Sequence, residues 1–373
     1  MRIVFWQNYQ NALQSSLIRA LADLVPTVLL VTQEDLPDWR RKCGWDIPNF
    51  GKTQLVVSPT QDSVSRILYE KQHESIHIFS VSRVDPLVWQ AFQKCRATQA
   101  KIGIYSEAYV WNDLKVALRL FRGWWDTFLY ESSVNFVLAI GEMGYRWFRM
   151  SGYPDHKLYQ FGYFVEQPLN QESDTNHFKQ SDGDSVEIVF IGQCIRRKGI
   201  DLLLQALSTL QYLNWKLQII GDGERKEAFE KLALQLGLSE RVNFLGVLKN
   251  ADARFVMKNS DLFVLPSRWD GWGAVVNEAL MEGVPVVCSD LCGSADLLGN
   301  LERGETFPAG SVTGLRDVLS KRITQGKRTA ELTNKIKEWS RNIRGEIAAD
   351  YLLDVIEASI YGKPKPVTPW LKR

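Results

Sequence analysis

The sequence predicts an α/β protein of two doubly wound domains that are similar in size. Short apolar runs alternate with longer segments of helical periodicity, and strands that alternate with helices form parallel sheets covered on both faces. The 373 residues suffice for two ordinary domains, and a polar stretch divides the chain near its middle. We therefore expect two Rossmann-like domains whose sheets face a central cleft, a common site for a nucleotide-type ligand.

Composition narrows the class of protein. Hydrophobic residues make up 45% and charged residues 24%, which excludes a wholly disordered chain. Lys and Arg number 45 against 43 Asp and Glu, so bulk electrostatics does not support a nucleic-acid partner. The five scattered cysteines indicate neither a disulfide framework nor a metal site and favour a reducing cytoplasm. The start of the chain turns polar by Gln7, and no apolar stretch reaches the ~18–20 residues of a membrane span, so we expect a cytoplasmic or membrane-peripheral protein.

Four segments are predicted along the chain: an N-terminal domain over 1–166, a polar linker over 167–185, a C-terminal domain over 186–340 and a helical tail over 341–373. We expect the tail to pack back on the N-terminal domain, at the end of a long, polar-faced helical segment over about 328–361. The expected strands are 3–6, 27–32, 55–58, 76–80, 101–105, 136–140, 187–192, 215–221, 241–245, 262–266 and 284–289. The expected helices include 15–24, 86–94, 200–210, 225–236, 251–259 and 273–282.

A basic glycine loop is the first candidate site. A predicted strand ends at Gly192, and Gly199 opens a helix after Arg196, Arg197 and Lys198. Such a loop directs backbone N–H groups and positive charge toward an anion. The alternative is a plain turn with solvated basic side chains.

A pair of carboxylates is the second candidate. Asp270 lies in the loop before the predicted helix 273–282, and Glu278 is expected about two turns into it. The two could accept hydrogen bonds from hydroxyl groups, or Asp270 could simply cap the helix while Glu278 faces solvent. Two further loops, 220–224 and 289–296, also follow predicted strands. Loops at the carboxyl ends of parallel strands converge on one crevice, which strengthens the joint interpretation.

Residues 186–315 resemble the donor domain of the retaining family 4 glycosyltransferases, which have the GT-B fold. The resemblance rests on the order of several motifs along more than a hundred residues. The first half is similar only in its alternation and in the segment around Ile140-Gly141-Glu142-Met143. The motifs in the second half are Gly192…Lys198-Gly199, Gly221-Asp222-Gly223, Arg241–Gly246, Pro266-Ser267 and Asp270-x7-Glu278.

The resemblance implies a C-terminal domain that holds a nucleoside diphosphate sugar and an N-terminal domain that holds the acceptor, without a metal or other cofactor. A basic Arg and Lys pair neutralises the leaving diphosphate in that family. Lys198 matches the Lys, but Gln193 occupies the usual Arg position, so Arg196 or Arg197 would supply the second charge. Asp270, where the family has Glu, would hold hydroxyls of the transferred sugar, and Glu278 would hold the ribose.

The resemblance also implies the full site. Many members carry a His in the N-terminal domain near the transferred sugar, and Glu107 lies in that region here, as a polar substitute or as a structural carboxylate. The expected catalytic residues are Lys198, Asp270 and Glu107. The expected donor-binding residues are Gly192, Gln193, Arg196, Arg197, Gly221, Asp222, Gly223, Gly271, Trp272, Gly273, Ala274 and Glu278, with the helix start at 271–274 facing the diphosphate.

The implied reaction is transfer of a hexosyl-type sugar from a UDP- or GDP-linked donor with retention of anomeric configuration, and stabilisation of the leaving group is its main catalytic effect. Two alternatives stay open: a nucleotide-sugar epimerase of the same fold, and a non-catalytic nucleotide-sugar-binding scaffold.

Residues 114–130 interleave basic and aromatic side chains at helical spacing. This pattern fits an interfacial helix on anionic lipid at the inner face of the cell membrane and an acceptor that is a carbohydrate or lipid-linked, as in surface polysaccharide or glycolipid assembly. The alternative is a core helix with its charges toward water. Gly123 is expected to interrupt the helix, and Asp126 opposes an anionic surface.

Overall fold

The computed structural model describes residues 1–42, 45, 47–80, 85–108, 116–167 and 183–371. The chain divides into two compact units. The first unit comprises residues 1–38, 46–166 and 342–372, and the second comprises residues 39–45, 167–341 and 373. Most of the predicted linker, residues 168–182, lies outside the described residues.

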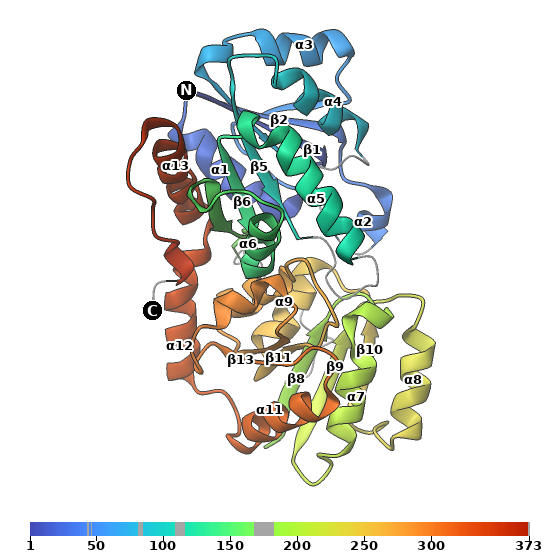
Figure 1. Ribbon diagram of the computed structural model, residues 1–373. Coiled ribbons are helices and arrows are strands. Elements are labelled where there is room, and N and C mark those ends of the chain that lie inside the picture. The colour runs from blue at the N-terminus through green and yellow to red at the C-terminus, as the bar shows by residue number, and fades with distance from the viewer. Residues whose placement is uncertain (43–44, 46, 81–84, 109–115, 168–182, 372–373) are drawn as a thin grey trace. The chain divides into compact units, whose positions relative to one another are not determined.

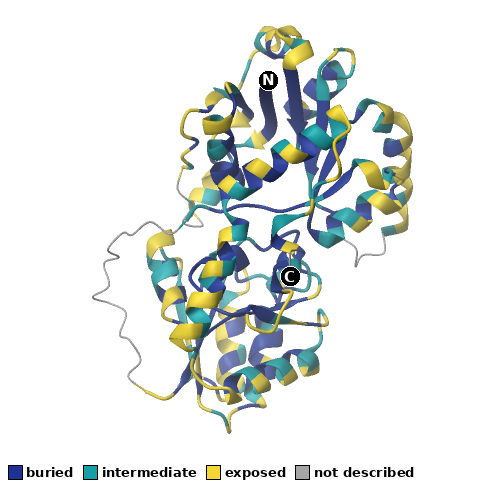
Figure 2. Ribbon diagram, turned by 90° about the vertical axis from the view of Figure 1, so that its left-hand side faces the viewer, coloured by how far each residue is buried: buried dark blue, intermediate teal, exposed yellow. Residues whose placement is uncertain are grey.

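The first unit is built on a seven-stranded parallel sheet in the order β3-β2-β1-β4-β5-β6-β7 (Figure 1). Every residue of β4 and β6 is buried, because helices cover both faces of a parallel sheet. Burial follows the same layering in Figure 2, where the strands are dark blue and the helices expose their outer sides. The strands are β1 (Arg2–Tyr9), β2 (Thr27–Glu34), β3 (Gln54–Val57), β4 (Ser75–Phe79), β5 (Lys101–Ser106), β6 (Phe136–Ile140) and β7 (Leu158–Phe161).

The C-terminal part of the chain belongs to the first unit. Helix α13 (Gly345–Tyr361) lies beside α1 (Ala12–Leu24), and a Cβ on Gly345 would come within 2.5 Å of the Ser16 backbone (Figure 1). Trp370 is buried against Phe161 and Tyr351. The other helices between residues 38 and 150 are α2 (Asp38–Lys42), which spans the boundary between the units, α3 (Gln61–Tyr69), α4 (Pro86–Cys95), α5 (Val116–Tyr130) and α6 (Gly141–Met150).

The second unit repeats this winding with six parallel strands in the order β10-β9-β8-β11-β12-β13. Its strands are β8 (Val186–Ile191), β9 (Trp215–Ile220), β10 (Val242–Gly246), β11 (Leu262–Leu265), β12 (Val286–Ser289) and β13 (Gly304–Phe307). Its helices are α7 (Ile200–Ser208), α8 (Lys226–Gln235), α9 (Asn250–Lys258), α10 (Val275–Met281), α11 (Val312–Thr324) and α12 (Ala330–Trp339).

The structure confirms the predicted strands and corrects three other expectations. Two edge strands, β7 and β13, are additional. The long terminal helix is broken: α12 ends at Trp339, a short 3-10 turn follows, and α13 buries one face on α1. The helix predicted over 273–282 begins only at Val275, because Gly273 has a φ of +84°, which is outside the helical region. Glu278 is therefore in the first turn of α10, and not two turns along it.

Strand order determines where a ligand can bind in each unit. The direction of winding reverses between β1 and β4 in the first unit and between β8 and β11 in the second. The loops that leave the carboxyl ends of these neighbouring strands run apart and leave a crevice. The basic loop 192–199 follows β8, and the loop that carries Asp270 follows β11, so the two strongest candidate motifs flank the switch point of the second unit.

Candidate functional site

Close backbone contacts hold the loops at the carboxyl edge of the second sheet together. The N–H of Gly192 donates to Ile220 O, and the N–H of Cys194 donates to Asp222 O, which ties the β8 loop to the β9 loop. A Cβ on Gly221 would lie 1.9 Å from Gly192 O. Glycine at this position therefore permits an approach that any side chain would block.

The β8 loop approaches the β11 loop in the same way. Gly199 has a φ of +73°, and a Cβ there would lie 2.0 Å from the carbonyl oxygen of Pro266. Arg268 fastens this contact: its backbone N–H donates to Arg197 O, and its guanidinium forms paired hydrogen bonds of 2.8 and 2.7 Å with Asp201. The basic loop is thus fixed to the element that carries Asp270.

An ion pair joins the two strongest candidate motifs. Lys198 Nζ lies 2.5 Å from Asp270 Oδ2, and both side chains are nearly buried, at 12% and 11% exposed. Arg197 approaches the other carboxylate oxygen at 3.5 Å and is 37% exposed. The buried Ser267 hydroxyl lies 3.4 Å from Asp270 Oδ2. The structure therefore places a carboxylate between two cations at the switch point of the sheet.

Glu278 differs from Asp270 in its surroundings. It is half-buried in the first turn of α10, and no described residue forms a hydrogen bond or ion pair with its carboxylate. Burial raises the pKa of the Glu278 carboxyl above its ordinary range; the Arg254 charge opposes this and Glu282 adds to it. Arg254 is itself bound to Glu282 at 3.0 Å. The carboxylate of Glu278 is therefore unpaired among the described residues.

The remaining predicted donor-binding residues of the second unit differ in how far they are exposed. Trp272 is 3% exposed, and its indole N–H donates to Asn277 Oδ1 at 2.8 Å, so its ring belongs to the packing beneath the loop. Gly271, Gly273 and Ala274 form the backbone that leads into α10. Arg196, Asp222 and Gly223 are exposed, and Asp222 Oδ1 accepts from the N–H of Gly223. Gln193 is half-buried.

Glu107 belongs to the first unit. It is half-buried directly after β5, and the buried Tyr163 donates a hydrogen bond to it. Burial and the negative charge of Glu107 raise the pKa of Tyr163 well above its ordinary value, so this phenol remains protonated. Tyr105, also buried, donates to Gly162 O at 2.6 Å. Glu107 is therefore held by a tyrosine that sequence reasoning did not identify.

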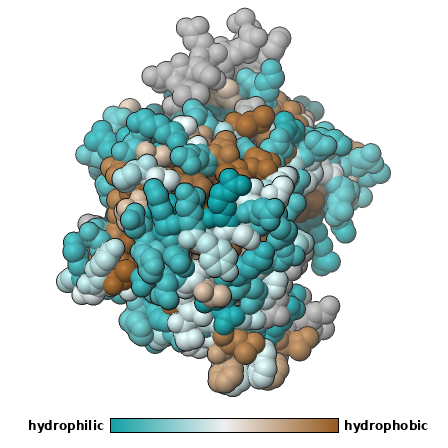
Figure 3. Space-filling view, turned by 90° about the horizontal axis from the view of Figure 1, so that it is seen from above, coloured by the Kyte–Doolittle hydropathy of each residue, from teal (hydrophilic) through white to brown (hydrophobic). Residues whose placement is uncertain are grey.

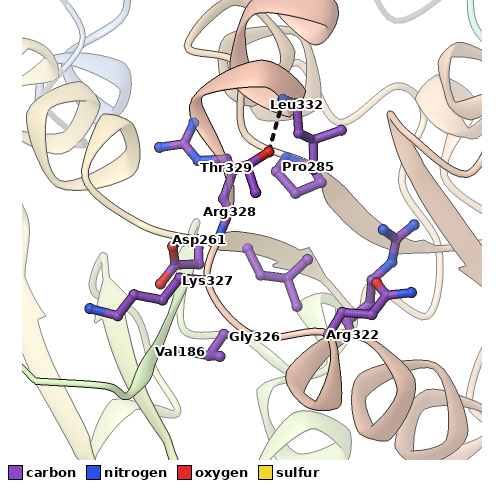
Figure 4. A pocket seen from close by; sticks show the side chains of 11 residues that line it. Val186, Asp261, Pro285, Arg322, Gly326, Lys327, Arg328, Thr329 and Leu332 are labelled. Carbon is purple, nitrogen blue, oxygen red and sulfur yellow. Dashed lines mark hydrogen bonds between the residues drawn. The ribbon is translucent and has the colours of Figure 1, made fainter.

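The pocket in Figure 4 lies at the opposite edge of the second sheet. Its volume is about 190 Å³, and it is lined by Val186, Leu262 and Pro285 at the amino ends of β8, β11 and β12. Arg328, which also lines it, already donates to Gly283 O and Lys258 O. None of the predicted site residues lines this pocket, so the candidate site is the one at the carboxyl edge.

Besides Tyr163, the prediction missed Ser267 and Arg268, which contact the Asp270 loop, and Arg254, whose charge acts on Glu278. Ser267 and Arg268 lie inside the motif that carries Asp270, and their position next to it was the available signal. The contact of Arg268 with Asp201 spans 67 positions, and no spacing rule indicates it.

Within the ranges that the structure describes, no cluster of His, Cys, Asp and Glu could hold a metal ion. No described helix has the length and apolar content that crossing a bilayer requires.

The second unit is similar in sequence to a known protein family. Residues 172–339, which include the whole candidate site of the second unit, match the family model "Glycosyl transferases group 1". An uncharacterised glycosyltransferase of Methanocaldococcus jannaschii is 34% identical over 126 residues, which are 33% of this chain and 32% of that protein. The lipopolysaccharide core biosynthesis glycosyltransferase LpsE of Rhizobium meliloti is 26% identical over 181 residues, 48% of this chain and 51% of LpsE.

Structural likeness extends over both units. The crystal structure of Anabaena Alr3699/HepE in complex with UDP matches with a TM-score of 0.72 at 16% identity and covers 96% of this chain and all of that one. With two parallel Rossmann-like sheets, the chain has the GT-B fold of glycosyltransferases. In sequence, by contrast, the matches span only about a third of the length of the first curated relatives, 32%, 28% and 30%.

Proposed function

We propose that this protein is a glycosyltransferase that moves a sugar from a nucleoside diphosphate sugar to an acceptor. The Lys198–Asp270 ion pair at the switch point of the second sheet carries the proposal. It places a cation, Lys198, beside a carboxylate, Asp270, that can accept hydrogen bonds from hydroxyl groups, and both side chains are nearly buried. A donor that carries both a diphosphate and a sugar offers a partner to each of these groups.

When the donor binds, its phosphate and hydroxyl groups would replace the contact between Lys198 and Asp270. Lys198 would leave Asp270 for a phosphate oxygen, while Asp270 would accept hydrogen bonds from sugar hydroxyls. Arg197 would add the second positive charge, in place of an Arg at position 193, and Glu278 would accept from the ribose. These side-chain cations would perform the neutralisation for which other phosphate sites use a metal ion, and so we propose a metal-independent reaction.

The proposed chemistry is a substitution at the anomeric carbon. The bond from this carbon to the phosphate oxygen breaks, and its electron pair stays on the diphosphate beside Lys198 and Arg197. The acceptor hydroxyl oxygen forms the new bond on the same face, which retains the configuration, and its proton passes to the departing phosphate oxygen. Glu107 would contact the acceptor or the transferred sugar.

The comparisons support a biological setting for this proposal. LpsE is named for lipopolysaccharide core biosynthesis, and the HepE crystal structure contains UDP. We therefore favour a UDP-linked hexose over a GDP-linked one, a carbohydrate or lipid-linked acceptor in surface polysaccharide or glycolipid assembly, and action at the cytoplasmic face of the membrane.

The first test is a thermal-shift screen of the purified protein with UDP, GDP and their sugar conjugates. A ligand of the folded state at a hundred times its Kd stabilises by ~2.7 kcal/mol, and we expect UDP to raise the melting temperature. Lys198→Ala should abolish the shift at the same ligand concentration. No shift with any nucleotide would contradict the proposal.

The second test separates the three possible activities of a nucleotide-sugar binder. A transferase releases nucleoside diphosphate only when an acceptor is present, and NMR of the product should show retained anomeric configuration. An epimerase would isomerise the donor without an acceptor. A scaffold would bind the donor without turnover, and either of these two results would replace the transferase assignment.

A further inference from the structure

Helix α5 of the first unit carries an unusual concentration of exposed hydrophobic side chains. Six of the 21 large hydrophobic side chains that are strongly exposed among the described residues lie on this 15-residue helix. A folded monomer rarely leaves so much contiguous apolar surface in water unless the surface binds something. The six are Leu118 (68% exposed), Phe121 (64%), Trp124 (53%), Trp125 (50%), Phe128 (71%) and Leu129 (38%).

These side chains share one face of α5. At 100° per residue, positions 118, 121, 125 and 128 form a stripe one above another, with 124 and 129 on its flanks. Phe128 stacks with Trp124 at a centroid distance of 6.2 Å and lies 6.0 Å from Trp125. We call this set of six residues the α5 apolar face. In Figure 3 a group of hydrophobic side chains reaches the surface at the lower edge of the view.

The opposite face of α5 is the one that packs on the protein. Thr127 is the buried residue of the helix, and a Cβ on Gly123 would meet the Ser151 hydroxyl at 2.7 Å. The sequence predicted that Gly123 interrupts the helix, and this prediction is wrong, because α5 runs unbroken through it. Gly123 instead lets α5 approach the end of α6 closely. The packed face is accounted for, and the α5 apolar face has no partner within the described chain that buries it.

Charge indicates the kind of partner. Arg122 is exposed beside the α5 apolar face, and no described residue pairs with it, while Arg119 and Asp126 are half-buried one turn away on the same flank. The accessible charge at the rim is thus positive. Tryptophan prefers the headgroup level of a bilayer, phenylalanine and leucine suit its acyl region, and arginine binds phosphate. A second copy of the chain would bring the same Arg122 and no exposed anion from this face.

We propose that the α5 apolar face docks this protein on an anionic lipid bilayer, with α5 parallel to the membrane plane, the six apolar side chains in the interface and Arg122 on a lipid phosphate. This inference deepens the proposed function, which sets the reaction at the membrane face. Its evidence is separate, because α5 and the residues that anchor it all belong to the first unit.

The test is sedimentation of the full-length protein with vesicles of phosphatidylcholine alone and of phosphatidylcholine mixed with phosphatidylglycerol. We expect binding to the mixed vesicles that weakens as salt is added, and little binding to the neutral ones. The triple variant Phe121→Ala/Trp125→Ala/Phe128→Ala should bind at least about tenfold more weakly. Arg122→Glu should lower binding to the mixed vesicles only.

The matched control removes as much exposed apolar surface elsewhere. Tyr212→Ala/Leu234→Ala/Leu301→Ala truncates side chains of the second unit that are 75%, 69% and 62% exposed, and it should bind like the wild type. If the α5 triple variant fails to fold, quenching of wild-type tryptophan fluorescence by lipids brominated on their acyl chains replaces it, and we expect quenching in mixed vesicles.

Three outcomes would overturn the proposal: no sedimentation with mixed vesicles, equal binding by the α5 triple variant, or wild-type dimerisation that this variant abolishes, which would assign the face to a second copy. The UDP thermal shift, measured on the same samples, reports on the second unit. A failure of membrane docking is therefore distinguishable from a failure of the proposed function.

Discussion

In the second unit, cations and a carboxylate follow the carboxyl ends of β8 and β11, whereas tyrosines and Glu107 lie at the equivalent edge of the first unit. Both sheets wind in the same order and place their switch point between equivalent strands. The loops make the difference: glycines at 199 and 221 draw the second unit's loops into contact, and Arg268 and Lys198 fasten them by charge. Topology thus decides where a site lies, and loop residues decide its chemistry.

The two units also differ in how they treat a buried titratable group. The first unit holds His77 in the middle of its sheet, where its Nδ1 accepts a hydrogen bond from Trp6 Nε1. The second holds Glu278 at its edge, half-buried and without a partner among the described residues. Substitutions at four positions test this contrast: His77 in the core of the first unit, and Gly199, Lys198 and Glu278 at the candidate site of the second.

The largest expected effect concerns His77. Burial, with the Arg2 charge, lowers its pKa to about 3 from 6.5. Below pH 6.5 the unfolded chain therefore binds a proton that the folded chain does not. The free energy of unfolding decreases as the pH is lowered from 6.5 toward 3. Between pH 7 and pH 4 this single group costs on the order of 3 kcal/mol. In urea unfolding, His77→Gln should show a pH dependence that is weaker by about this amount, and the exposed His73→Gln is the control for replacing a histidine. Parallel curves for wild type and His77→Gln would contradict the assignment.

The next effect concerns loop contact in the second unit. Gly199 and Gly237 have nearly the same φ, +73° and +70°, but a Cβ on Gly199 meets Pro266 O at 2.0 Å and one on Gly237 meets nothing within 4 Å. Gly237→Ala should cost about 1 kcal/mol of the free energy of unfolding for its left-handed backbone alone. Gly199→Ala should cost more, roughly 2 to 3 kcal/mol, because the loop must also move. Equal losses in chemical denaturation would mean that the two loops do not depend on this contact.

Lys198→Ala tests whether the charged edge acts in catalysis. If Lys198 stabilises the leaving diphosphate, its removal should lower kcat by about 100-fold, the usual effect of losing one such group. The exposed Lys231→Ala on α8 is the control for loss of a positive charge, and Lys198→Arg should restore part of the rate. The measurement is nucleoside diphosphate release with donor and acceptor. An unchanged kcat would exclude Lys198 from the reaction.

The same contrast shows what a sequence can predict in this fold. The parallel strands were predictable because each buried run is bounded by turn residues. The location of Lys198 and Asp270 at one edge of the sheet was predictable because both follow strand ends, and the roles of Lys198, Asp270 and Glu278 stay predictions. The Lys198–Asp270 pairing was not predictable, since each side chain was expected to meet a ligand. Nor were Arg268 with Asp201, Tyr163 with Glu107, or Gly123 with Ser151, because these contacts depend on how separate elements pack in three dimensions.

Glu278→Gln should have the smallest effect, with opposite signs for binding and stability. A neutral amide accepts hydrogen bonds from a ribose less strongly than a carboxylate, so donor affinity should fall roughly tenfold. The folded pKa of Glu278 is raised above its unfolded value of 4.5, so its ionisation costs stability as pH rises past the folded pKa. The variant should therefore be more stable than the wild type at pH 7, by a margin that disappears below pH 4.5.

Glu282→Gln provides the matched control one turn along the chain. Glu282 is bound to Arg254 at 3.0 Å, with side chains only 6% and 11% exposed, so the same substitution there leaves a buried guanidinium without its carboxylate and should destabilise the protein at pH 7. Thermal unfolding and donor titration of both variants decide the matter. If Glu278→Gln loses stability as Glu282→Gln does, Glu278 is a structural carboxylate. A gain in stability together with weaker donor binding is the combination expected of a group that the fold keeps for its ligand.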